Sequence, residues 1–133
     1  MKNETSIFGD ADVISTYTRA EAIEDGFLVD LMQGEMLEVC KQHFSWPIAC
    51  TNTVFSIMQK AVENKKHCND YAGILHDMLH MSKVYYQRID DSSRYFKVII
   101  TGAGRKRNYV FKMMVHAGDH GEGVVTIMMP NED

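Results

Sequence analysis

The sequence has little proline and none of the tracts that usually separate domains. Only Pro47 and Pro130 occur, and there is no repeat, low-complexity stretch or Gly/Ser-rich linker. With 133 residues, the chain falls within the usual size of one domain. We therefore expect a single domain over residues 1–133, in which residues 1–6 form a flexible N-terminus and residues 130–133 an acidic tail.

Long apolar runs, paired cysteines and a secretory leader are also lacking. No apolar run approaches the ~20 residues that cross a bilayer, and the first six residues carry no apolar stretch typical of a signal peptide. The three cysteines, Cys40, Cys50 and Cys68, are odd in number and include no CxxC pair. This pattern favours free thiols in a reducing compartment, so we expect a cytoplasmic protein with no membrane partner.

An excess of charge of one sign is missing as well. The formal net charge is −4, with 18 acidic residues. A general nucleic-acid binder needs surplus Lys and Arg to meet phosphates, and a DNA mimic needs a denser carboxylate array. The composition indicates neither, although a local basic patch stays open as an alternative.

Helical patterns fill the first two thirds of the chain. Thr18 and Glu21 have the spacing of a capping box, and Gly26 supplies a left-handed stop for that first helix. Apolar spacing predicts further helices over about 34–42, 53–65 and 70–88. One stripe of the last helix is expected to face the core: Tyr71, Ile74, Leu75, Met78, Met81 and Tyr85.

From Ser93 onward the hydrophobic period changes to that of strands. Short extended runs are expected at 27–29 and 48–50, and an antiparallel meander over 94–101, 108–116 and 124–129. Helices first and strands last predict an α+β fold, in which the N-terminal helices pack on one face of a small C-terminal antiparallel β-meander. The free edges of such a sheet make a homodimer conceivable.

The sharpest chemical motif is a pair of histidines one helical turn apart, His76 and His80. Such a pair can share a zinc ion, and Asp77 could act as a base, as in the HExxH logic of metalloproteases. Solvent-exposed histidines on a polar helix face are the simpler interpretation. A third ligand would have to come from elsewhere in the chain, from His67, His116 or His120.

Two turns carry charged or glycine-rich clusters. Arg105, Lys106 and Arg107 form a basic hairpin tip that could contact phosphate, with Tyr109 adding stacking, or could simply be solvated. The turn 118–123 is rich in glycine but lies between two strands, so a hairpin is a better interpretation than a phosphate cradle or a calcium loop. No catalytic set and no cofactor follow from these patterns.

Two segments carry a family resemblance. The run Tyr17-Thr-Arg-Ala-Glu-Ala-Ile-Glu-Asp-Gly26, within 13–30, and the ending Gly118-Asp-His-Gly-Glu-Gly-Val-Val-Thr-Ile-Met-Met-Pro-Asn-Glu-Asp133 resemble an uncharacterised family of small phage- and plasmid-encoded proteins. His120 stands where that family's pattern has Asp, and Gly123 where it has Pro. The resemblance implies a mobile genetic element acting inside a bacterial host.

The leading hypothesis is therefore a non-catalytic accessory protein that binds a host protein or nucleoprotein and inhibits a bacterial defence system. The alternatives are a small enzyme, either a metal-dependent hydrolase using His76 and His80 or one acting on a nucleotide, and a nucleic-acid-binding accessory using residues 105–107. Four residues of the opening motif have no evident scaffold role and are the expected functional surface: Tyr17, Arg19, Glu24 and Asp25. Internal bonds from Arg19 to the two acids are the simpler expectation for them.

Overall fold

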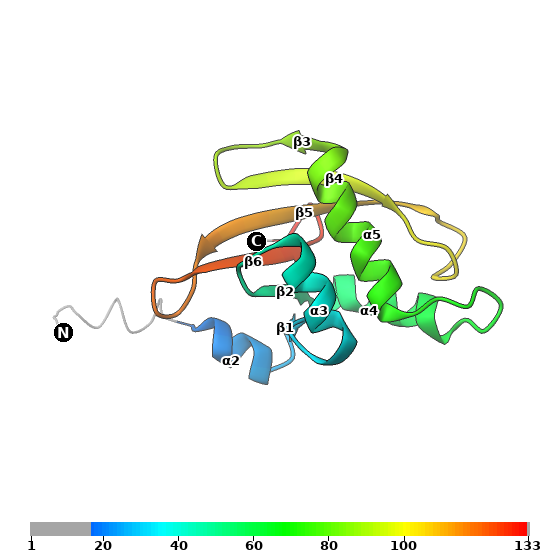
Figure 1. The fold of residues 1–133 in the computed structure, drawn as a ribbon, viewed down its shortest axis with the longest axis horizontal. Helices are drawn as coiled ribbons and strands as arrows, with labels where there is room; N and C mark the ends of the chain where they lie inside the picture. The colour runs from blue at the N-terminus through cyan, green and yellow to red at the C-terminus, as the bar shows by residue number, and fades with distance from the viewer. Residues whose placement is uncertain (1–16, 133) are drawn as a thin grey trace, which may run out of the picture.

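A computed structural model describes residues 17–132 as four helices and a six-stranded sheet (Figure 1). The helices are α2 (Arg19–Glu24), α3 (Gly34–His43), α4 (Asn52–Glu63) and α5 (Tyr71–Val84). The strands are β1 (Leu28–Asp30), β2 (Ile48–Thr51), β3 (Tyr86–Arg88), β4 (Ser93–Ile99), β5 (Asn108–Ala117) and β6 (Gly123–Met128). The expected flexible segment at residues 1–6 lies outside the described residues.

The sheet has the strand order β1-β2-β6-β5-β4-β3. The predicted meander is present as β4, β5 and β6, which pair antiparallel. β2 adds to this meander by pairing parallel with β6, from Ile48 opposite Val125 to Cys50 opposite Ile127. The predicted α+β class is confirmed, and the sheet extends beyond the meander because strands from the helical part of the chain join both of its sides.

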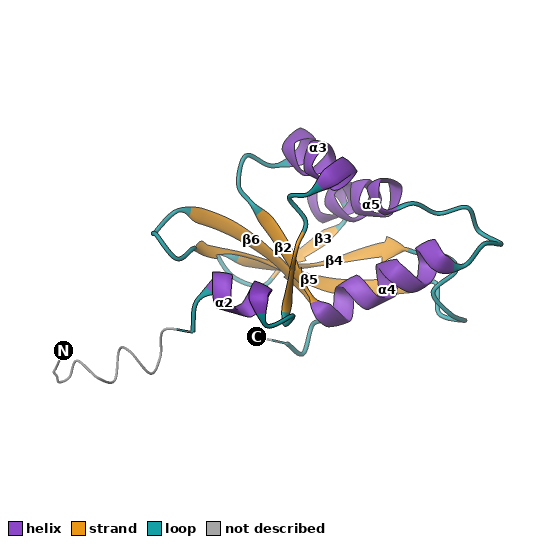
Figure 2. Ribbon diagram, turned by 90° about the horizontal axis from the view of Figure 1, so that it is seen from below, coloured by secondary structure: helices purple, strands orange, loops and turns teal. Residues whose placement is uncertain are grey.

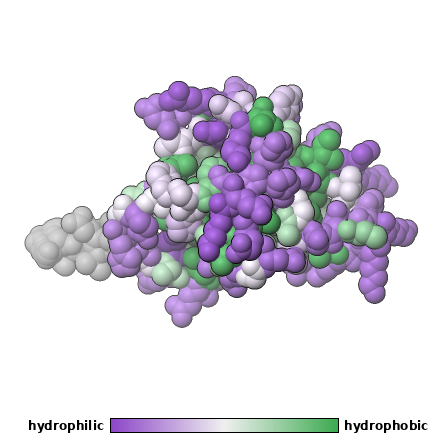
Figure 3. Space-filling view, in the orientation of Figure 1, coloured by the Kyte–Doolittle hydropathy of each residue, from purple (hydrophilic) through white to green (hydrophobic). Residues whose placement is uncertain are grey.

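One face of the sheet carries the main core. Phe96 in β4, Phe111 in β5 and Ile127 in β6 point to this face and are at most 1% exposed. Full burial of such a side chain contributes about 1.5–3 kcal/mol relative to leaving it in water. Helices α3 and α5 lie side by side over this face (Figure 2), and their outer side is mainly hydrophilic (Figure 3).

The short helix α2 lies on the opposite face of the sheet (Figure 2). Its predicted capping box is confirmed, because the Glu21 N–H donates to Thr18 Oγ1 and the Thr18 N–H to Glu21 Oε1, each at 3.0 Å. Gly26 has a φ of +84°, the left-handed conformation that was expected to end this helix. The chain then turns directly into β1.

Helices α3 and α4 follow their predicted ranges closely, but α5 is shorter than predicted. The expected helix over 70–88 begins as predicted, since Asp70 caps it by accepting the Gly73 N–H at 2.7 Å. It ends at Val84, and the next residues form β3 against β4. Tyr85 is 57% exposed, so its assignment to the core stripe was wrong. Pairing with β4 outweighs helical continuation here, and aromatic side chains suit a strand.

Candidate functional site

The opening and closing motifs of the sequence contact each other in the structure. Asp119, in the turn between β5 and β6, accepts the backbone N–H groups of Arg19 and Ala20 at 2.8 and 3.0 Å. These are orphan donors at the start of α2, so the carboxylate acts as an additional cap. The same two N–H groups hold the pKa of Asp119 below its usual range. The turn therefore fixes α2 to the sheet.

Arg19 is not bound to the neighbouring acids, contrary to expectation. Its guanidinium donates to Thr126 Oγ1 at 2.7 Å and to the Val125 carbonyl at 2.9 Å, both in β6. Partial burial lowers the pKa of Arg19, and the nearby carboxylates of Asp30 and Asp119 oppose that shift. The side chain thus anchors α2 to the middle of the sheet.

The four residues of the expected functional surface divide among different environments. Tyr17 donates its hydroxyl to Asp25 Oδ2 at 2.6 Å, and this bond raises the pKa of Tyr17 to about 12. Tyr17 and Arg19 line a cleft between α2 and the sheet, whereas Glu24 is exposed and lies outside the lining. The structure therefore does not bring the four together as one surface.

We call this space the α2 cleft; it has a volume of about 630 Å³. At its floor, Thr126 Oγ1 lies 2.8 Å from His116 Nε2, so one hydroxyl joins the imidazole to Arg19. At its far side, Glu132 accepts the Thr51 hydroxyl at 2.8 Å. These polar groups bond to each other, which gives the cleft an evident role in holding α2 and the chain end on the sheet.

The basic hairpin tip lies at the opposite end of the molecule. Arg105, Lys106 and Arg107 are all exposed. The loop after α4 lies beside this hairpin (Figure 1). A hydrogen bond joins the two, in which Asn64 Nδ2 donates to the Gly102 carbonyl at 3.0 Å. That loop adds two more exposed lysines. We call the resulting cluster the basic end; its members are Lys65, Lys66, Arg105, Lys106 and Arg107.

The sequence suggested that Tyr109 adds stacking at this basic end, but its position in the structure prevents this. It is 6% exposed, faces the main core, and donates its hydroxyl to the Lys106 carbonyl at 3.2 Å. Alternation along β5 explains the error, because the pairing of Tyr109 with Val98 places both on the covered face.

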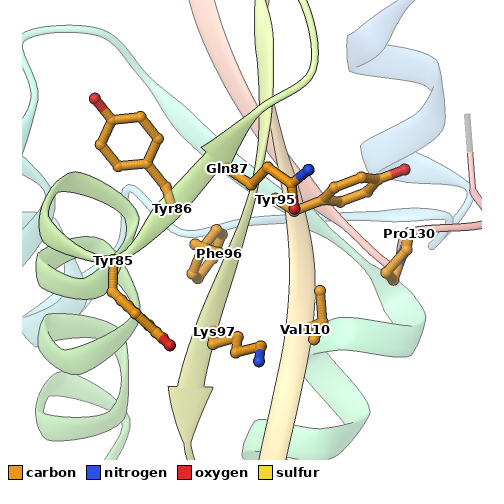
Figure 4. A pocket seen from close by; sticks show the side chains of 8 residues that line it. All are labelled: Tyr85, Tyr86, Gln87, Tyr95, Phe96, Lys97, Val110 and Pro130. Carbon is orange, nitrogen blue, oxygen red and sulfur yellow. The ribbon is translucent and has the colours of Figure 1, made fainter.

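Other tyrosines face outward on the sheet, further along β4 from the basic end. The sheet face opposite α5 has a hollow of about 530 Å³ (Figure 4), which we call the tyrosine hollow. Tyr95 and Lys97 line it from β4, Tyr85 from the residue before β3, and Val110 from β5. Sequence analysis missed this site. The signal was the alternation in β4, which puts Tyr95, Lys97 and Ile99 on the face that the core residues do not use.

The histidine pair meets a third histidine that the sequence did not indicate. His43 Nε2, at the end of α3, lies 3.0 Å from His76 Nδ1, and the His76 and His80 rings stack at 6.0 Å between centroids. The expected additional ligands lie elsewhere: His67 against Gly102, His116 in the α2 cleft, and His120 in the 118–123 turn. Among residues 17–132, no group of three or more His, Cys, Asp or Glu side chains has a metal-binding arrangement.

The glycine-rich turn and the cysteines have structural explanations. Residues 118–123 form a hairpin, as predicted, closed by the Gly118 N–H donating to the Glu122 carbonyl at 2.6 Å. Cys40 and Cys50 are fully buried, and burial raises their thiol pKa values to about 11 and about 12. Cys68 is exposed, and all three thiols are free.

Comparison with known proteins places the chain in a family. Residues 4–133 match the model described as "Family of unknown function (DUF6573)". The chain belongs to this family. No curated protein and no solved structure was found to match it. Within the described part of this DUF6573 chain, no helix has the length and apolar character needed to span a membrane.

Proposed function

We propose that this protein is a non-catalytic nucleic-acid-binding accessory that acts through the basic end and the adjoining sheet face. The observation that carries the proposal is the uneven distribution of charge. Residues 83–112 hold eight Lys and Arg against two Asp, a balance of +6, while the rest of the chain holds six basic against sixteen acidic residues, a balance of −10. The net charge of −4 conceals this separation.

The fold gathers part of this positive charge at one end: Arg105, Lys106 and Arg107 follow the end of β4, whereas Arg88 and Arg94 pair near its start. The basic end stands at one end of the sheet, whereas the acidic turn containing Asp119 and Glu122 and the helix α2 stand at the other (Figure 1). A polyanion is attracted to the first and repelled by the second, which orients it during approach. Lys97 continues the positive strip from the hairpin along the open face of β4.

A host protein is the competing partner, and the methionine content of the chain gives it little support. The chain has ten methionines, and exposed methionines would give a host protein an adaptable surface to bind. Four methionines are at most 3% exposed and belong to the interior: Met58, Met78, Met113 and Met128. We therefore favour a nucleic-acid partner. Origin from a mobile element and inhibition of a bacterial defence system remain our wider biological hypothesis.

The test is the salt dependence of binding by the full chain. With four phosphate contacts, the affinity for a single-stranded oligonucleotide should fall roughly 50-fold between about 50 and 200 mM salt. Replacing Arg105, Lys106 and Arg107 with Gln should lower the slope of log affinity against log salt by about 2. Lys41→Gln, on α3 over the other face of the sheet, is the control and should change affinity less than about twofold.

The outcomes separate the two partner classes. Affinity for oligonucleotides that does not change with salt contradicts phosphate contacts. Salt-dependent binding to polyglutamate without binding to oligonucleotides would instead show a surface for acidic proteins and overturn the proposal.

A further inference from the structure

We propose that the tyrosine hollow takes an unpaired nucleobase, so that the protein binds single-stranded nucleic acid in preference to duplex. This inference rests on the proposed function, but a different observation carries it. The proposed function depends on charge, which duplex and single strand share. The hollow is an aromatic and apolar feature, and a duplex keeps its base faces stacked inside.

The hollow has the size and lining of a site for a flat organic ring. Its volume of about 530 Å³ falls in the range of small-molecule pockets. Tyr95 and Tyr85 lie on two sides of it, and Val110 and Pro130 add apolar surface (Figure 4). Every nucleobase has a π-face, so stacking on tyrosine does not require a particular base.

The tyrosines are available for stacking. Tyr85 is 57% exposed and Tyr95 is partly exposed, and α5 packs on β4 from the opposite side. Tyr86 provides an internal contrast. Tyr86 follows Tyr85 and also contributes to the lining, but its ring is covered by Arg94 at 4.2 Å from the centroid.

Polar groups beside the hollow can meet first the edge of a base and then the phosphates of a single strand. Gln87 extends beside Tyr95 (Figure 4), where its amide can meet the hydrogen-bonding edge of a base. Lys97 lies two residues along the same face of β4, and the basic hairpin follows the end of that strand. From Tyr95 to Ile99 the strip is about 14 Å long, at about 3.4 Å per residue. A strand with its base in the hollow therefore passes its phosphates along Lys97 toward Arg105.

The experiment compares the full chain on a labelled oligothymidylate of about 12 nucleotides and on a duplex of equal length. We expect the single strand to bind about tenfold more tightly. Tyr95→Leu should weaken single-strand binding about tenfold and leave duplex binding unchanged, whereas Tyr95→Phe, which keeps the aromatic face, should retain it. Tyr17→Leu, an exposed tyrosine in the α2 cleft, is the control and should change neither by more than about twofold.

A second readout reports stacking directly. A 2-aminopurine base placed within the oligonucleotide should change its emission on binding, and this change should be lost in Tyr95→Leu but kept in Tyr95→Phe. Equal, salt-dependent affinity for duplex and single strand overturns this inference and leaves the proposed function standing. If neither nucleic acid binds in a salt-dependent way, the proposed function itself fails.

Discussion

His43 sits at a contact between two helices where a positive charge is unfavourable. Burial lowers the pKa of His43, and Lys83, His76 and His80, which face it from α5, lower it further. The folded protein therefore binds fewer protons than the unfolded chain when the pH falls below the ordinary histidine value of 6.5. Stability that depends on neutral His43 is present above about pH 6.5 and is lost as the pH falls toward the folded-state pKa.

This predicts a pH-dependent loss of thermal stability that a single substitution reduces. Between pH 7.5 and 5.5, Tm should fall more in the wild type than in His43→Gln, since glutamine keeps a polar group but cannot be protonated. Asp90, Asp119 and Glu122, whose pKa values are lowered, affect stability only at more acidic pH. Parallel Tm curves for the two proteins in this window would show that His43 does not couple protonation to folding.

Gly123 is the second residue whose neighbours define its role. A Cβ atom at this position would lie 2.6 Å from two ring atoms of Trp46, closer than van der Waals contact allows. We expect Gly123→Ala to destabilise the protein by about 1–2 kcal/mol, measured by chemical denaturation, because the indole must move. In a Trp46→Leu background the same substitution should cost less; an equal cost in both backgrounds would mean that the ring is not the cause.

At the scale of elements, the docking of α2 depends on a turn about 100 residues away in sequence. Asp119→Asn removes the negative charge that meets the first N–H groups of this helix. Amide hydrogen exchange in α2 should become roughly three- to tenfold faster, with little change in α5. Asp91→Asn, at the exposed turn between β3 and β4, is a control of the same chemistry and should leave α2 unchanged.

The docking of α2 should weaken at acidic pH, because the pKa of Asp119 is lowered in the folded protein. The lowered pKa of Asp119 means that its stabilisation is present above the ordinary value of 3.8 and is lost as the pH falls through the folded-state pKa. The difference in exchange between wild type and Asp119→Asn should therefore be full at neutral pH and disappear well below pH 3.8. A difference that persists in acid would point to shape rather than charge.

Local signals were sufficient for some elements and not for others. The capping box of Thr18 and Glu21, the start of α5 near Asp70 and the strands of the meander depend on neighbours in sequence, and the sequence predicted them. The end of α5 depends on a partner strand, since Tyr86 pairs with Phe96 in β4. A helical stripe continued through Tyr85 is therefore locally reasonable and wrong in the fold.

The same division applies to the candidate site. The basic hairpin was visible because its three charges are consecutive. The tyrosine hollow was not, because Tyr85, Tyr95 and Pro130 come from three segments that only the sheet brings together. The partners of Arg19 could not be predicted from sequence either, because they lie in β6, 106 and 107 positions further along the chain.

For the whole molecule, the acidic and basic clusters lie at opposite ends of the sheet. The acidic turn and α2 stand at one end, and the basic end stands at the other (Figure 1). A net charge close to zero therefore says little about partners when a fold sorts the charges by position. Local charge along the strands is the informative quantity.

The position of β6 has a consequence for synthesis. Of the six described strands, β6 is the last to be synthesised, yet it lies in the interior of the sheet and links the β1–β2 pair to β5 and β4. While translation continues, the two halves of the sheet have no strand to join them, and β2 and β5 each expose an unpaired edge. The nascent chain thus stays open to chaperones, proteases and early partners until β6 emerges.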